Sequence, residues 1–258
     1  MKKAGFAFIL SLIASLSANS AVDSFLQKYQ LIYQDLVINN QIYPVGTDIC
    51  NTRYELVKPI LNQYNRPFTL LDLGAAQGYF SLRIASEYPH STCVMIEANN
   101  TSYYAHHGDM LYDLCQMNPQ LDNIYYLQKR VDIEDLQFVK QKQHFDIVLA
   151  FLVVHLMHDQ LDEQIKILNS LLEIGDNLII EVANDVHISH TNYVEFLSHK
   201  LGAVFLGELR RHKDPKSTST GKFYWFKSRD FKIDNVPRSG IQSEIFKKLN
   251  GVYPYETK

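Results

Sequence analysis

The chain has 258 residues, of which 46% are hydrophobic and 21% are charged, and its formal net charge at neutral pH is −3. This length suffices for one α/β domain with a complete core and small additions. The composition is that of an ordinary globular protein, and the charge gives no nucleic-acid signature. Cys50, Cys93 and Cys115 share no metal-type spacing, so neither a zinc site nor a disulfide framework is expected.

The first twenty residues have the pattern of a secretory signal. Lys2 and Lys3 precede an uncharged run over residues 4–16, and small residues follow at 17–21. This pattern predicts export to the periplasm or the medium, with cleavage after Ser20 and no transmembrane helix in the mature chain. The alternative is an apolar helix that packs on the domain of a cytoplasmic protein.

Residues 21–66 are expected to form a helical N-terminal cap. Asp23 or Ser24 can cap a first helix, whose apolar stripe runs from Phe25 to Val37. A loop over residues 39–51 follows. Thr52 and Glu55 then have the spacing of a capping box, which predicts the start of a second helix.

The chain is organised around residues 68–88. Residues 68–73 are apolar except for Asp72 and predict a buried strand, and residues 79–88 have helical periodicity. Gly74 and Gly78 lie in the turn between them. Glycine permits positive φ and lets a ligand approach the backbone, and the start of the following helix favours electron-rich groups.

A second carboxylate follows at the end of the next predicted strand, residues 93–97. Glu97 comes 19 residues after Gly78 and can accept two hydrogen bonds from the hydroxyls of a ribose. The turn has the form D-x-G-x-x-x-G, which differs from the dinucleotide fingerprint G-x-G-x-x-G. A glycine turn in another nucleotide-binding βαβ unit is the alternative.

Three further parallel strands and a hairpin are predicted downstream. The strands cover residues 124–131, 145–151 and 177–183, and helices are expected at 110–117, 164–172 and 193–201. Strands 203–209 and 222–227 enclose a basic loop. Residues 210–232 hold eight Lys or Arg against two Asp, a local net charge of +6. A short helix near 243–249 ends the predicted elements.

Asp72, Gly74, Gly78, Glu97, the Phe145-Asp146 strand and the final hairpin together resemble the class I S-adenosylmethionine-dependent methyltransferases. The resemblance implies an α/β fold with a doubly wound, mostly parallel seven-stranded sheet, a C-terminal antiparallel hairpin and helices on both faces. It divides the chain into a signal peptide (1–20), a helical cap (21–66), a methyltransferase-like domain (67–232) and a short tail (233–258).

The resemblance also implies S-adenosylmethionine as the cofactor. The implied cofactor-binding residues are Asp72, Gly74, Ala75, Gly78, Glu97, Asp132 and Phe151. Asp132 occupies the family's position for an acid that binds the adenine amino group, with Glu134 and Asp135 as close competitors. Leading helices cover the cofactor in this family, so Arg53 can bind the cofactor carboxylate or the substrate. An exposed Arg53 at a helix start is the alternative.

Candidates for the chemistry lie at the carboxyl ends of the later strands. His155 is the best candidate for a general base, although it can also serve only to pack near the cofactor. Arg210, Arg211 and Lys213 are candidates for binding an anionic acceptor, and a solvated basic loop is the alternative. Asn184-Asp185 resembles a catechol-type metal pair in reversed order, and the fourth strand lacks the partner carboxylate, so no metal is expected.

The expected reaction is methyl transfer to an O, N or S acceptor that the sequence does not identify. In such a reaction the alignment of the acceptor contributes most of the catalysis. The alternative is an exported, non-catalytic protein that keeps the fold as a small-molecule binding module. Aminopropyl transfer on the same fold ranks lower, since no acidic polyamine-binding set is evident.

Overall fold

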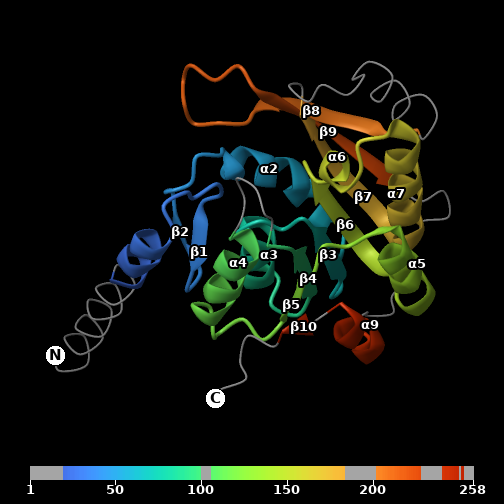
Figure 1. Ribbon diagram of the computed structural model, residues 1–258, viewed down its shortest axis with the longest axis horizontal. Helices are drawn as coiled ribbons and strands as arrows, with labels where there is room; N and C mark the ends of the chain where they lie inside the picture. Colours follow the sequence, from blue (N-terminus) through green and yellow to red (C-terminus); the bar gives the residue numbers. More distant parts are fainter. Residues whose placement is uncertain (1–19, 100–105, 184–201, 228–239, 250, 253–258) are drawn as a thin grey trace.

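The computed structural model describes residues 20–99, 106–183, 202–227, 240–249 and 251–252. Its main feature is one sheet with the strand order β10-β5-β4-β3-β6-β7-β9-β8 (Figure 1). The parallel strands are β3 (Thr69–Leu73), β4 (Thr92–Glu97), β5 (Ile124–Gln128), β6 (Phe145–Phe151) and β7 (Gly175–Ala183). The antiparallel strands are β8 (Val204–Arg210), β9 (Thr220–Lys227) and β10 (Gly251–Val252). The predicted seven-stranded, mostly parallel sheet with a final hairpin is confirmed, and β10 adds an eighth strand.

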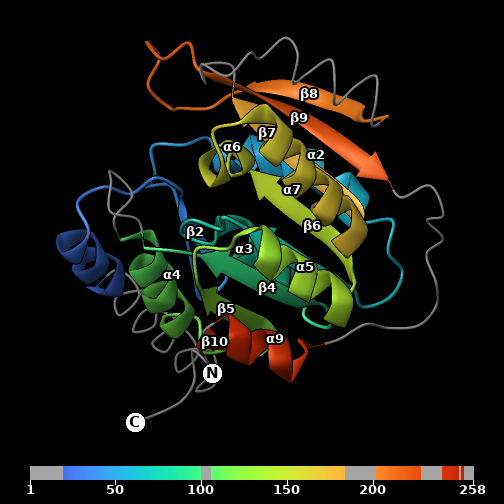
Figure 2. The same ribbon diagram turned by 45° about the vertical axis from the view of Figure 1, so that its right-hand side comes forward.

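Helices cover both faces of this sheet (Figure 2). On one face lie α2 (Cys50–Leu61), α3 (Tyr79–Glu87) and α4 (His107–Gln116). On the other lie α5 (Ile133–Lys142), α7 (Leu161–Ile174) and α9 (Ser243–Lys248), with the short α6 (Val154–Met157) beside α7. The chain therefore has the three layers expected of a doubly wound fold.

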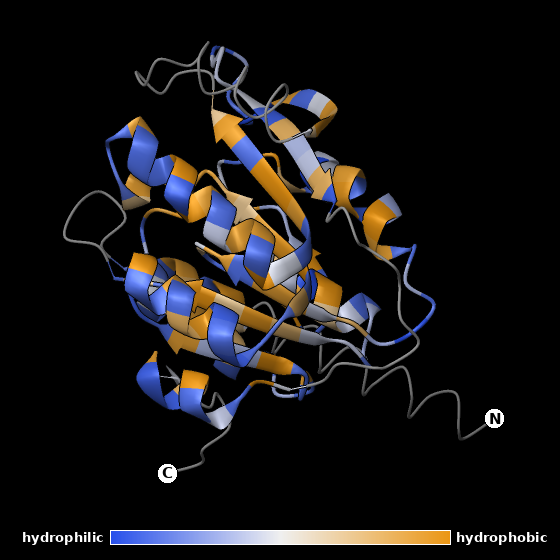
Figure 3. Ribbon diagram, turned by 90° about the vertical axis from the view of Figure 1, so that its right-hand side faces the viewer, coloured by the Kyte–Doolittle hydropathy of each residue, from blue (hydrophilic) through white to orange (hydrophobic). Residues whose placement is uncertain are grey.

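Alternation along the strands builds two separate cores. Leu70, Cys93 and Ile147 pack with α2, α3 and α4, whereas their neighbours Leu71 and Val94 pack with α5 and α7. Because successive strand side chains point to opposite faces, a strand buried on both faces must be apolar throughout. Figure 3 shows this as largely orange central strands between helices that carry both colours.

The Phe145-Asp146 pair has a structural role at the start of β6. The buried carboxylate of Asp146 pairs with Arg66 at 2.7 Å and accepts a hydrogen bond of 2.7 Å from the backbone N–H of Thr69. It thus joins the amino ends of β3 and β6, at the edge of the sheet opposite to the predicted site.

The N-terminal cap differs from its prediction. The first helix ends at residue 28, and the chain then forms a hairpin of β1 (Leu36–Ile38) and β2 (Gln41–Tyr43). Asn39 and Asn40 both have positive φ, 50° and 63°, which asparagine tolerates in tight hairpin turns. The long first helix was therefore a wrong prediction, because part of its apolar stripe belongs to a buried strand.

The predicted capping box at Thr52 is also wrong. Helix α2 begins at Cys50, and its N-cap Ile49 makes no side-chain capping bond. The backbone N–H of Ile49 instead donates to the carbonyl of Arg211 at 2.8 Å. The hairpin between β8 and β9 therefore helps to fix where α2 begins, and Figure 1 shows that hairpin loop reaching beyond α2.

Smaller differences concern strand and helix ends. Strand β5 ends at Gln128, before the predicted 131, and α4 begins at His107, before the predicted 110. The two-residue strand β10 was not predicted. Residues 1–19 of the predicted signal segment and the predicted helix at 193–201 lie outside the described residues.

Candidate active site

The turn between β3 and α3 has the conformation that its glycines predict. Gly74 and Gly78 both have φ of 75°, and Gly78 is the N-cap of α3. A Cβ atom at Gly74 would lie 2.6 Å from Cγ2 of Val153, and one at Gly78 would lie 2.5 Å from Cδ1 of Leu111. Both positions therefore favour glycine for its backbone freedom and for space.

Glu97 at the end of β4 is held against this turn. One of its carboxylate oxygens accepts a hydrogen bond of 2.7 Å from the N–H of Ala76, and the other accepts one of 2.9 Å from the N–H of Ala98. Burial raises the pKa of Glu97, and the two backbone N–H groups oppose that rise. Since a carboxylate oxygen can accept more than one hydrogen bond, Glu97 keeps capacity for the hydroxyls of a ligand.

Asp72 is a second carboxylate near the turn, and unlike Glu97 it is fully buried. It lies on β3, and its side chain accepts a hydrogen bond of 2.7 Å from the hydroxyl of Ser81. Burial raises the pKa of Asp72 to about 7, with the charge of Glu97 acting in the same direction. A buried carboxyl group of this kind favours a cationic ligand group beside it.

Two cavities lie at the carboxyl ends of the parallel strands, with volumes of about 150 Å³ and 120 Å³. They share Gly74, Glu97, Val153 and Leu156, and together they are called the glycine-turn cleft below. Asp72, Phe80, Phe151 and His155 line its larger part. Ala75 is buried in the turn, and its N–H donates to the carbonyl of Ile96 at 3.1 Å.

Asp132 does not line this cleft, although Val131 beside it does. The Asp132 side chain caps α5 by accepting from the N–H of Asp135 at 2.9 Å. Asp135 itself is buried and pairs with Lys129 at 2.6 Å, and Glu134 is exposed in the first turn of α5. The structure therefore places the three candidate adenine-binding acids in or beside a helix cap.

Arg53 is buried, so the interpretation as an exposed arginine was wrong. It is 1% exposed and lines the cleft. Its guanidinium lies 2.8 Å from Oδ2 of Asp48 and 3.4 Å from Oε1 of Glu181, a residue near the carboxyl end of β7. Burial raises the pKa of Glu181 to about 7, while the positive charges of Arg53 and Arg211 oppose that rise. A Cβ atom at Gly221 would lie 2.0 Å from Oε1 of Glu181, so glycine there makes room for the carboxylate.

The three basic candidates of the hairpin have different surroundings. Arg211 lines the cleft, and its guanidinium donates to the hydroxyl of Ser219 at 3.1 Å. Lys213 lies 2.5 Å from Oδ1 of Asp35 and ties the hairpin to the N-terminal cap. Arg210 donates to backbone carbonyls of the hairpin loop. The structure thus brings Arg211 to the site, whereas Arg210 and Lys213 hold the loop.

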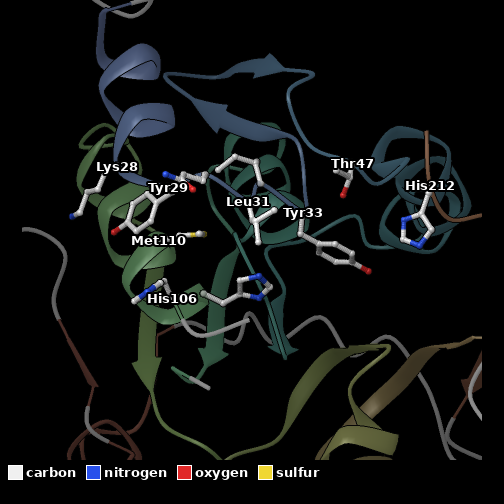
Figure 4. Close-up of a pocket in the computed structure, with 11 residues that line it drawn as sticks. Lys28, Tyr29, Leu31, Tyr33, Thr47, His106, Met110 and His212 are labelled. Carbon is white, nitrogen blue, oxygen red and sulfur yellow. The ribbon is translucent and has the colours of Figure 1, made fainter. Parts of the chain in front are cut away.

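A larger cavity of about 440 Å³ lies beside the cleft and is called the Tyr33 cavity below. Tyr33 and His107 line both the Tyr33 cavity and the cleft. Figure 4 shows its labelled side chains around a central space, with Tyr29, Met110 and His106 on one side and Thr47 and His212 on the other. Burial lowers the pKa of His107 to about 4, so its imidazole is neutral at physiological pH.

Several of these residues were missed in the sequence, namely Tyr33, Asp48, His107 and Glu181. Glu181 carried a usable signal, since it is the only charged residue in the apolar run over residues 178–183 of β7. Asp48 lies in a predicted loop, Tyr33 lies in the stretch wrongly predicted as a long helix, and His107 lies before the predicted start of α4. In the part of the chain that the structure describes, no cluster of three His, Cys, Asp or Glu could hold a metal ion. Asn184 and Asp185 lie outside it.

No protein-family model matches the sequence. Among curated proteins, the O-antigen chain terminator bifunctional methyltransferase/kinase WbdD of Escherichia coli is 29% identical over 143 residues. That match covers 52% of this chain and 18% of the relative, so the chain corresponds to a small part of it.

Solved structures of methyltransferases also resemble this chain in fold. A structure of WbdD has a TM-score of 0.62 at 20% identity, over 85% of this chain and 49% of that one. The N-terminal domain of EvdMO1 with SAH bound has a TM-score of 0.54 at 11% identity, over 82% and 97% of the two chains. The strand order, the glycine turn and these neighbours agree. The chain has the fold of the class I S-adenosylmethionine-dependent methyltransferases, as its sequence motifs predicted.

Proposed function

We propose that this protein binds S-adenosylmethionine in the glycine-turn cleft and is a methyltransferase. The observation that carries the proposal is Glu97, whose carboxylate is fixed by the N–H groups of Ala76 and Ala98 beside a turn with two glycines at positive φ. This arrangement gives a hydrogen-bond acceptor for ribose hydroxyls next to backbone that a ligand can approach. The methyltransferase neighbours support the same cofactor.

The other residues of the cleft fit the two ends of that cofactor. Asp72 would hold the α-ammonium group, because a buried carboxyl whose pKa is about 7 gains a counter-charge there. Arg53 would hold the α-carboxylate, since it lines the cleft and carries a positive charge. Gly74, Ala75 and Gly78 would pass beneath the methionine part, and Val131 and Met157 would flank the adenine. Asp132 remains a proposal that requires release of its helix-capping bond.

When bound, the cofactor supplies an electrophilic methyl group on a sulfonium. The chain's own contribution is to orient that group and the acceptor and to exclude water, which accounts for most of the rate in reactions of this type. His155 lines the cleft and is proposed as the group that removes a proton from the acceptor. The proposed acceptor is a small molecule with an O, N or S nucleophile, and Arg211, which lines the cleft, would donate hydrogen bonds to it.

Native mass spectrometry of the full-length chain tests the proposal. S-adenosylmethionine and its demethylated product should each give a one-to-one complex, and NAD⁺ at the same concentration should not compete. Conversion of the bound cofactor in the presence of an acceptor separates the enzyme from a non-catalytic binding module. A preference for NAD⁺ would assign the cleft to dinucleotide chemistry instead.

Export remains a proposal that rests on Lys2, Lys3 and the short apolar run that follows. Among the described residues, no helix is long and apolar enough to cross a membrane. Intact-mass analysis of the protein from its native host should show a chain that begins at Ala21. A chain that begins at Met1 in the cytosolic fraction would refute export and would place the protein where S-adenosylmethionine is made.

A further inference from the structure

The Tyr33 cavity adjoins the larger part of the cleft, which would hold the methionine part of the cofactor with its methyl group. Glu97 and Val131 mark the ribose and adenine side of the cleft, and Arg53 and Asp72 mark the amino-acid side. Tyr33 and His107 line the larger part of the cleft and the Tyr33 cavity alike. The cavity and the cleft are therefore adjacent and share this part of their walls. The cavity, at about 440 Å³, has room for a small molecule of its own.

The charged groups along this cavity are already balanced by partners. The ammonium of Lys28 lies 2.6 Å from Oδ2 of Asp113, which also accepts a hydrogen bond of 2.9 Å from the hydroxyl of Tyr29. Nδ1 of His212 lies 2.8 Å from Oδ1 of Asp48. The cavity wall therefore offers no strong field for a fixed anion or cation, and a charged acceptor would lose its hydration without gaining a counter-ion.

The rest of the wall combines flat rings with neutral polar groups. The rings of Tyr33 and His107 are stacked, with centroids 6.2 Å apart and an interplanar angle of 26°. Thr47 adds a hydroxyl, and the side chains of Ile32 and Met110 add apolar surface. Burial raises the pKa of Tyr33, so its phenol stays protonated. Such a wall suits a ring with a weakly polar face and hydroxyl groups at its edge.

We propose that the Tyr33 cavity binds the methyl acceptor, and that the acceptor is a neutral ring bearing hydroxyl groups, one of which points into the adjacent cleft beside Tyr33 and His107. This inference rests on the proposed methyltransferase function. In the transfer, the hydroxyl oxygen forms a bond to the methyl carbon while the carbon–sulfur bond breaks and leaves its electron pair on sulfur. The hydroxyl proton passes to the imidazole of His155, the base proposed above, which lines the cleft, and then to solvent.

Saturation-transfer NMR on the full-length chain tests this assignment. The protein carries S-adenosylhomocysteine at full occupancy. The probes are methyl α-D-glucopyranoside, methyl α-D-galactopyranoside, catechol and glucose 1-phosphate. At least one neutral probe should receive saturation, and the phosphorylated sugar should receive less. A response of the glycosides identifies a saccharide acceptor, and a response of catechol identifies a phenolic one.

Two tryptophan variants locate the binding. Leu31 is 54% exposed and lines the cavity, so Leu31→Trp should partly fill it and lower the signal of the responding probe at least fivefold. Ile42 is 42% exposed on β2 and does not line it, so Ile42→Trp should leave the signal unchanged. Both variants should bind S-adenosylhomocysteine as the unmodified chain does.

Three results would overturn the acceptor assignment while leaving the cofactor proposal intact. They are a lack of saturation in every neutral probe, an equal signal in Leu31→Trp, and a stronger response of glucose 1-phosphate. Failure of the chain to bind S-adenosylhomocysteine would instead contradict the proposed function itself.

Discussion

At the scale of single residues, three carboxylates that have lost much of their surrounding water lie in or behind the cleft. Asp72 and Glu97 line the cleft directly, and Glu181 acts on it through Arg53. Burial raises the pKa of all three, because each has lost water without a full replacement. Asp72 and Glu97 face the cleft, where an ammonium or hydroxyl group of a ligand would replace the hydrogen bonds to water that burial removed.

Asp72 should make cofactor affinity depend on pH. In the empty protein its pKa is about 7, so it holds a proton at pH 6 that binding of an ammonium group should expel. The affinity for S-adenosylhomocysteine should therefore rise between pH 5.5 and about pH 7.5. Calorimetry across this range measures the rise. The raised pKa of Glu97 should make the affinity rise with pH as well. The comparison is therefore with Asp72→Asn, in which the rise in affinity should be smaller.

The same residue lowers the stability of the empty protein as pH increases. The folded state keeps the Asp72 proton up to about pH 7, whereas the unfolded chain releases it near the ordinary value of 3.8. The folded state thus binds more protons in this window, and its contribution to stability is lost as pH rises through it. Between pH 4 and pH 7 the melting temperature of Asp72→Asn should fall less than that of the unmodified chain. An equal fall would contradict a pKa of Asp72 that is raised by burial.

Glu181 is expected to position Arg53. Glu181→Gln keeps the size of the side chain and removes one of the two carboxylates that hold the buried guanidinium. We expect a loss of stability of roughly 1–3 kcal/mol in chemical denaturation, together with weaker binding of S-adenosylhomocysteine. Glu173→Gln, on the exposed side of α7, is the control. If cofactor affinity were unchanged in Glu181→Gln, Arg53 would not depend on Glu181 for its placement.

At the scale of elements, the glycine turn links the fold to the site. Gly78→Ala should cost roughly 1–2 kcal/mol because Gly78 has a positive φ, and the added Cβ also meets Leu111. Gly202→Ala is a matched control, since Gly202 has φ of 69° and open space around it. Both variants should lose stability in chemical denaturation. Only Gly78→Ala should also weaken binding of S-adenosylhomocysteine, and equal binding in the two would separate the turn from the site.

The central strands could be predicted because burial on both faces leaves an apolar run of definite length. Residues 145–151 were predicted as a strand and form β6 with the same ends. Other elements gave no such signal. Two residues cannot show periodicity, so β10 was missed, and its pairing with β5 depends on a long-range contact. The start of α2 was misplaced because a carbonyl of the distant hairpin receives the N–H of Ile49.

The part of the candidate site that lies around the turn between β3 and α3 could be predicted from the sequence. Gly74, Gly78 and Glu97 come from consecutive elements, and their meeting follows from the βαβ geometry. Arg53 could not be placed in this way, because its partners Asp48 and Glu181 come from a loop and from β7. The residues around Asp132 also did not show whether it faces the cleft. Its side chain accepts a hydrogen bond from the N–H of Asp135 and caps α5.

At the scale of the whole molecule, the cleft and the Tyr33 cavity lie in a row. They run from Val131 past the glycine turn to the N-terminal segment around Tyr33. The hairpin between β8 and β9 braces this end through Arg211 and through the pair of Lys213 with Asp35. The N-terminal segment and the hairpin thus both contribute to the wall of the Tyr33 cavity.

The affinity for S-adenosylhomocysteine, measured by calorimetry on the full-length chain and on Glu97→Ala, tests the central claim most directly. We predict one-to-one binding by the unmodified chain and a loss of at least tenfold in Glu97→Ala, because the ribose loses its fixed acceptor. Glu173→Ala removes an exposed carboxylate on α7 and should bind as tightly as the unmodified chain. Equal affinity in Glu97→Ala, or no binding by the unmodified chain, would contradict the assignment of the glycine-turn cleft to S-adenosylmethionine.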